Sequence, residues 1–160
     1  MIFADPKQPH TDDFDLKHPW FELNTGENVI KHYEDVGDPE GLPKRVIITS
    51  TTKNLENLAH ARALHLDGTF KSCPKAWTQN FIITAEVTPR VWGKWSSDMY
   101  FLCTYYHCYI VTVPVVFGLL PNKKKASYAA FFGGIKNLLD DMDLEVTADY
   151  VMSDFEFNIK

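Results

Sequence analysis

The chain has 160 residues, of which 45% are hydrophobic and 23% are charged, so its length and composition suit one globular domain with a real core. Its formal net charge of −5 does not support tight DNA binding by this chain alone, because such proteins usually carry a basic face. Three cysteines without framework spacing and the lack of a targeting signal predict an intracellular protein of the nucleus or cytoplasm.

Residues 1–45 are rich in Asp, Pro, Gly and His and show no sustained apolar period. This composition predicts a weakly structured N-terminal arm, with one short amphipathic turn around Val29–Tyr33. A β-branched run follows at Arg45–Thr49, and Thr51 or Thr52 can then cap a helix. The apolar face of that helix comprises Leu55, Leu58 and Ala59.

Three strands are predicted next, at Ala61–Phe70, Asn80–Val87 and Ile110–Leu120. Alternation along the first strand places Asp67 on one face, together with Ala63, His65 and Thr69. Pro114 lacks an N–H group, so it predicts an edge or a bulge in the third strand.

A turn with three lysines, Lys123–Lys125, precedes a helical period from Ser127 to Met142, for which Ser127 is the predicted N-cap. Gly133 and Gly134 in mid-helix predict close packing against the sheet. Asp149–Ser153 then forms a short strand that delivers Asp154. This order predicts an α/β fold with a mixed sheet and a helix between the third and fourth strands.

Asp67 and Asp154 are the candidate catalytic and metal-binding residues. Each comes near the end of a predicted strand, and paired carboxylates on rigid strands are a common way to hold Mg²⁺. The residues alone leave two structural alternatives open. Asp67-Gly68 can form a turn, and Asp154 can cap a helix.

Five motifs, taken in order, resemble the transposase domain of Mutator-like elements: Asn54-Leu55, Leu66–Pro74 (LDGTFKSCP), Val113–Lys123 (VPVVFGLLPNK), Ser127-Tyr128 and Met152–Glu156 (MSDFE). The resemblance covers residues 46–160 apart from an atypical insert at about 88–111. It implies an incomplete ribonuclease-H-like fold whose first and fourth strands are neighbours. The family moves DNA with a DDE triad, two aspartates and a later glutamate, which holds Mg²⁺ or Mn²⁺.

Residue by residue, the resemblance matches Asp67 to the first aspartate of the triad and Asp154 to the second. The third acid has no counterpart in the chain, and Glu156 belongs to the second motif. The implied function is therefore a fragment or remnant of a DNA transposase that is inactive alone, with weak or no DNA binding of its own. The alternative is a domesticated, non-catalytic module that binds protein or DNA.

Other features leave further alternatives open. Met99–Leu120 contains no Asp, Glu, Lys or Arg and is long enough to span a bilayer, although β-branching and Pro114 favour a buried pair of strands. Cys103, His107 and Cys108 are a weak zinc signal without a fourth ligand. His65 is either a support for Asp67 or structural, and Lys123–Lys125 either touch a DNA phosphate or form a solvated turn.

Overall fold

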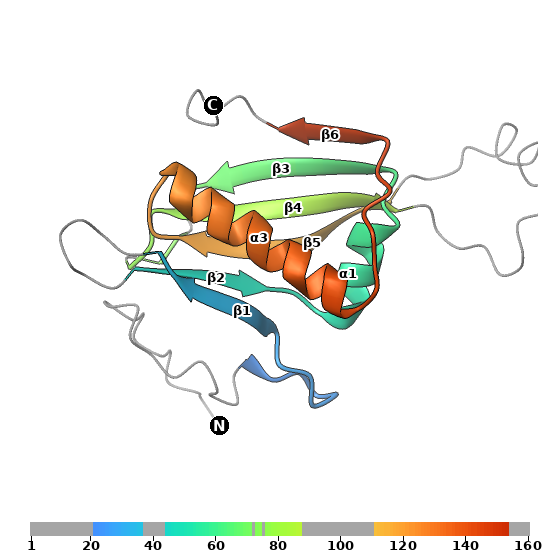
Figure 1. Ribbon diagram of the computed structural model, residues 1–160, viewed down its shortest axis with the longest axis horizontal. Helices are drawn as coiled ribbons and strands as arrows, with labels where there is room; N and C mark the ends of the chain where they lie inside the picture. The colour runs from blue at the N-terminus through green and yellow to red at the C-terminus, as the bar shows by residue number, and fades with distance from the viewer. Residues whose placement is uncertain (1–20, 37–43, 72, 75, 88–110, 154–160) are drawn as a thin grey trace, which may run out of the picture.

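The computed structural model describes residues 21–36, 44–71, 73–74, 76–87 and 111–153, which form a mixed α/β fold. One six-stranded sheet has the strand order β1-β2-β5-β4-β3-β6, and two helices accompany it in these ranges (Figure 1). The elements are β1 (Ile30–Asp35), β2 (Arg45–Thr49), α1 (Thr52–Ala59), β3 (Ala63–Thr69), β4 (Gln79–Val87), β5 (Val111–Leu120), α3 (Lys125–Asp141) and β6 (Tyr150–Ser153).

The centre of the sheet is an antiparallel meander of β3, β4 and β5, which are the three strands predicted from the sequence. β6 joins the outer edge of β3 and runs parallel to it. α3 lies between β5 and β6 in the chain, as predicted, and crosses in front of the sheet (Figure 1). The mixed sheet is therefore confirmed.

β1 corrects the expectation of a weakly structured arm with a short turn at Val29–Tyr33. Ile30–Asp35 forms a strand that pairs antiparallel with β2 along the other edge of the sheet. Local sequence hides it because an edge strand needs few apolar residues, and this one is mostly polar or charged. Its partner β2 supplies the burial, since Val46, Ile47 and Ile48 are at most 1% exposed.

The core lies between the sheet and α3, with Phe131 at its centre. The Phe131 side chain is fully buried and meets the Phe81 ring edge-on, with centroids 5.4 Å apart. Gly118 of β5 makes this packing possible, because a Cβ there would overlap the Phe131 ring. Gly134 likewise lies against His32 and Ile48, as predicted, whereas Gly133 has open space beside it, so close packing there was a wrong prediction.

The two helices begin differently. The Thr51 hydroxyl accepts a hydrogen bond from the Asn54 N–H at 3.1 Å, which confirms the predicted cap of α1. Ser127 is not the N-cap of α3, because the helix already starts at Lys125. The Asn122 side-chain oxygen instead accepts from the Lys124 N–H at 2.8 Å and from the Ser127 hydroxyl at 2.9 Å.

The β4–β5 pairing explains two sequence features. The register shifts beside Pro114, which is the predicted bulge, and β2 pairs with β5 only at Phe117–Leu119, beyond the proline. At the far end Val87 pairs with Val111, so the proposed insert joins two residues that already face each other. Residues 88–110 themselves lie outside the described ranges.

Val111–Leu120, the described part of the candidate membrane segment, is a strand. Among the residues with described structure, no helix has the length and apolar character needed to cross a membrane.

Candidate functional site

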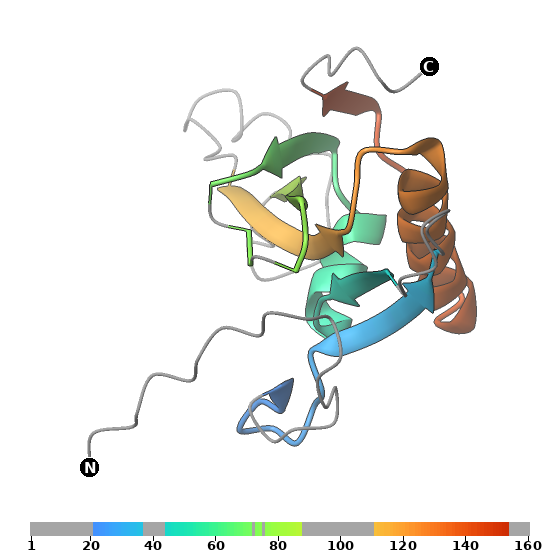
Figure 2. The same ribbon diagram turned by 90° about the vertical axis from the view of Figure 1, so that its left-hand side faces the viewer.

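The two faces of the sheet differ in character. We call the face against which α3 packs the helix face (Figure 2). It carries the buried residues Leu64, Phe81 and Ile83, and the Phe81 ring contacts Tyr128 of α3. We call the opposite one the Asp67 face, because alternation along β3 places Asp67 there with His65 and Thr69, as predicted. Asp67 is exposed, whereas Leu64 on the helix face is only 6% exposed.

Asp67-Gly68 does not form a turn. Both residues lie inside β3 and pair with Ile82 and Phe81 of β4, so the turn alternative was wrong. Gly68 is needed for another reason, because a Cβ there would overlap the side-chain amide of Gln79. The backbone that carries Asp67 thus rests directly on a buried side chain.

Gln79 is itself held in place from the helix face. Its side chain is fully buried, and its Oε1 accepts a hydrogen bond from the Tyr128 hydroxyl at 2.9 Å. Its Nε2 is buried without a hydrogen-bond partner among the described residues. The sequence analysis missed Gln79; its only local signal is a polar residue that leads into an apolar strand.

β6 brings the second aspartate motif to β3. The parallel register runs from Ala63 opposite Tyr150 to Leu66 opposite Ser153. Ser153 is the last described residue, so Asp154 lies outside the described ranges. The described ladder thus ends with the residues that directly precede Asp67 and Asp154 in the chain.

His65 has a partner other than Asp67. Its Nε2 lies 2.8 Å from Glu86 Oε1 across the β3–β4 ladder, and both side chains are largely shielded from solvent. This contact favours the structural alternative for His65. Glu86 was missed by the sequence analysis, because only the strand register reveals that it faces His65.

Asn80 adds an oxygen to the Asp67 face. It pairs with Thr69, two residues along β3 from Asp67, so alternation places it on the same face. Its Oδ1 is buried and has no hydrogen-bond partner within the described ranges. Hard divalent cations take carboxylate and amide oxygens, so the donors on this face suit Mg²⁺ or Mn²⁺.

In the described residues, no group of three or more His, Cys, Asp or Glu side chains could hold a metal ion. Cys103, His107 and Cys108 lie outside those ranges. Cys73 is half-buried, and this burial raises the pKa of its thiol. The Cys73 sulfur is therefore a poor nucleophile.

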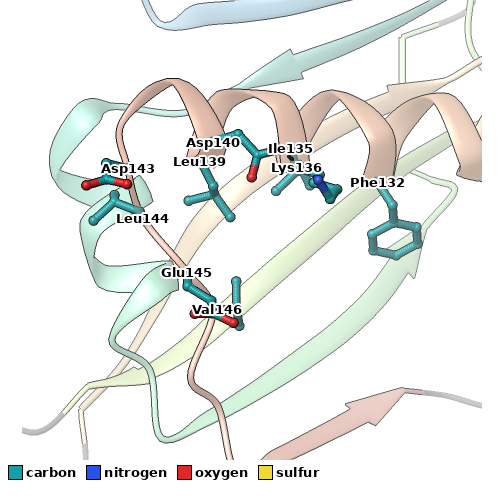
Figure 3. Close-up of a pocket in the computed structure, with 9 residues that line it drawn as sticks. All are labelled: Phe132, Ile135, Lys136, Leu139, Asp140, Asp143, Leu144, Glu145 and Val146. Carbon is teal, nitrogen blue, oxygen red and sulfur yellow. Dashed lines mark hydrogen bonds and ion pairs between the residues drawn. The ribbon is translucent and has the colours of Figure 1, made fainter.

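An open groove lies on the other side of the molecule, between α3 and the segment 143–146 (Figure 3). Its walls are mixed, with five apolar and four charged lining residues, and Lys136 Nζ forms an exposed ion pair with Asp140 Oδ2 at 2.7 Å. Its lining residues are Phe132, Ile135, Lys136, Leu139, Asp140, Asp143, Leu144, Glu145 and Val146. None of the predicted site residues contributes to it.

Comparison of the chain with protein-family models, with curated proteins and with solved structures gave no match.

Proposed function

We propose that the chain is the metal-binding part of a Mutator-like DNA transposase, present as a fragment or remnant, with Asp67 and Asp154 as ligands of Mg²⁺ or Mn²⁺. The observation that carries the proposal is the parallel β3–β6 ladder, which ends at Leu66 opposite Ser153. Each of these residues is bonded to one of the two aspartates, so the chain can bring both carboxylates to one end of two paired strands.

The topology supports a ribonuclease-H-like reading of the sheet. The sequence resemblance implies that the first and fourth strands of the domain are neighbours, and β3 and β6 are paired although β4, β5 and α3 separate them in the chain. The two strands β1 and β2 extend the sheet beyond β5, on the edge away from Asp67.

The donor set fits a hard cation. Asp67 offers an exposed carboxylate, and Asn80 offers a buried oxygen without a protein partner in the described part of the chain. A bound ion would supply Lewis-acid chemistry for phosphoryl transfer, activating a hydroxyl and stabilising a leaving oxygen. The protein's part is to fix these oxygens on rigid strands. Since the third acid of the triad has no counterpart, we expect weak ion binding and no DNA cleavage by this chain.

Titration with Mn²⁺, followed by electron paramagnetic resonance, tests the proposal. Asp67→Asn and Asp154→Asn should each abolish the bound-ion signal, because each removes one anionic ligand. Asp149→Asn is the matched control; it removes the same charge next to β6, at the end where the Asp149 N–H bonds to Arg62 O, and should leave binding unchanged. Equal binding by the Asp67→Asn variant and the parent chain would refute the metal site.

A non-catalytic binding module is the second candidate, and the exposed edge strand β6 favours it. Tyr150 and Val151 are each 61% exposed, and no described strand pairs with the outer edge of β6, to which a strand of a partner could add. This function requires no ion. If neither the parent chain nor any variant binds Mn²⁺, the metal-site proposal is excluded and the non-catalytic binding module remains.

A further inference from the structure

One end of the sheet collects positive charge from three separate turns. It is the end where β3 and β5 finish and where β2, β4 and α3 begin, at the left of Figure 1. Of the ten lysines and arginines in the described ranges, six lie there: Lys44, Arg45, Lys71, Lys123, Lys124 and Lys125. In the sequence these residues form three unrelated groups, and only the strand register brings them together.

Specific contacts join these turns. Lys123 Nζ lies 3.8 Å from the centroid of the Phe70 ring, which connects the β5–α3 turn to the end of β3. The Thr78 hydroxyl donates to Pro121 O at 2.7 Å, and Trp77 Nε1 donates to Arg45 O at 2.8 Å. The turn between β3 and β4 therefore bridges the other two.

The acidic residues gather at the opposite end. Glu86 pairs with Ala63 at the start of β3, and the Asp149 N–H bonds to Arg62 O just before that strand. α3 ends there as well, with exposed acids at Asp140, Asp141, Asp143 and Glu145. At the basic end Asp35 is paired with Arg45 at 3.1 Å, which leaves Glu34 and Asp67 as the other described acids nearby. Among the described residues, positive and negative charges are therefore separated along the strands.

We propose that Lys71, Lys124 and Lys125 form a contact surface for the phosphodiester backbone of a DNA strand that leads to Asp67. All three side chains are exposed, and none forms an ion pair with another described residue. We call them the lysine rim. The proposal rests on the proposed function, because it is the Asp67 carboxylate, near the end of β3 at this end of the sheet, that calls for a phosphate substrate.

A nucleic-acid backbone fits the rim better than an acidic peptide does. Lysines contact phosphates as point charges and need no paired geometry, and a regular polyanion can meet cations that come from separate turns. Three phosphate contacts predict a slope of about −3 in log K against log salt for duplex DNA. Such binding is independent of base sequence and weak, with a Kd of about 10⁻⁴ to 10⁻⁶ M at physiological salt.

The test uses fluorescence anisotropy of a short labelled duplex with the full chain in EDTA, between about 50 and 200 mM salt. The variant Lys71→Gln/Lys124→Gln/Lys125→Gln should bind at least about tenfold more weakly at the low salt, with a slope close to zero. The matched control is Lys53→Gln/Arg62→Gln/Lys136→Gln, which removes the same charge away from the rim. It should change the affinity less than about twofold, and circular dichroism should show both variants folded.

Equal loss of affinity in the two triple variants would overturn the proposal, because only net charge would then matter. Competition by polyglutamate as strong as competition by unlabelled duplex would also overturn it, since the rim would then not distinguish a phosphate backbone from any polyanion.

Asp67→Asn separates this inference from the proposed function. In EDTA the variant should keep duplex binding, because it leaves the rim intact and removes a negative charge at the same end of the sheet. Rim-dependent binding in a chain that takes no Mn²⁺ would refute the metal site and support the rim. Mn²⁺ binding without rim-dependent DNA binding would support the metal site and refute the rim.

Discussion

The two faces of the sheet are built from the same strands, but one packs against α3 and the other carries polar and charged side chains. The helix face depends on close packing, since Gly118 leaves room for the Phe131 ring and Gly134 lets α3 approach β1 and β2. On the Asp67 face, the central strands carry polar and charged groups such as His65, Asp67 and Glu86. Successive side chains of a strand point to opposite faces, so a core residue and a candidate site residue can be neighbours in the chain. Substitutions on the two faces should therefore have different effects on stability.

The largest expected effect is on the helix face. Phe131→Ala should lower the free energy of unfolding by about 3–5 kcal/mol, because it leaves a cavity under α3. Urea denaturation followed by circular dichroism measures it. Phe132→Ala is the matched control, since Phe132 is 39% exposed and should cost far less. Similar losses in the two variants would break the comparison.

A substitution at Gly68 tests the close contact between β3, which carries Asp67, and the buried Gln79 side chain. Gly68→Ala should cost about 1–3 kcal/mol, because the new Cβ forces the buried Gln79 amide aside. In a double-mutant cycle with Gln79→Ala, much of this cost should disappear, although that change also removes the hydrogen bond from the Tyr128 hydroxyl to Gln79. Purely additive costs would show that the loss does not come from the overlap with Gln79.

A comparison of the two faces at acid pH must allow for Glu27, which lies on neither face and makes the stability of the fold depend on pH. Hydrogen bonds from Lys31 and Thr52 lower the pKa of the Glu27 carboxyl from 4.5 to about 2. Since the folded pKa is the lower one, Glu27 stabilises the fold above about pH 4.5, and this contribution is lost as the pH falls toward 2.

Glu27→Gln should therefore reduce stability by about 1 kcal/mol at neutral pH and flatten the pH profile in that acid range. Chemical denaturation at a series of pH values provides the measurement, with the exposed Glu22→Gln as control. An unchanged slope between pH 4.5 and 2 in the Glu27 variant would contradict this assignment.

The smallest effect on stability should come from the residue that matters most for the proposed function. Asp67→Asn should change the free energy of unfolding by less than about 0.5 kcal/mol, because the side chain is exposed. The same urea experiment measures it. A loss above about 1 kcal/mol would show that Asp67 serves the fold, and its role as a ligand would then lose its main support.

The features that the sequence predicted correctly are those encoded by short-range patterns. β3, β4 and β5 follow from alternation and β-branching, the Thr51 cap follows from its position, and the side of β3 that carries Asp67 follows from the period of two. Asp67 itself came from its motif. Asp154, the second half of the candidate site, lies outside the described ranges.

The features that were missed depend on contacts between distant segments. β1 is a strand because β2 needs a neighbour, which its own polar sequence does not reveal. Ser127 has the right chemistry for an N-cap, but α3 already begins at Lys125, and the Ser127 hydroxyl instead donates to Asn122 Oδ1 in the preceding turn. The partnership of His65 with Glu86, the support of Gly68 by Gln79 and the lysine rim all follow from strand register, which one sequence does not specify.

The pairing of β6 with β3 has a consequence for the order of folding. β3, β4 and α3 can form early from contacts near in sequence. The β3–β6 ladder instead joins residues 87 positions apart in the chain (150 − 63), so its formation has a high loop-closure entropy. β6 should therefore dock last and open first in hydrogen exchange. A cation held at the end of this ladder would bind only the finished fold, so by mass action it would raise the stability of the most weakly secured strand.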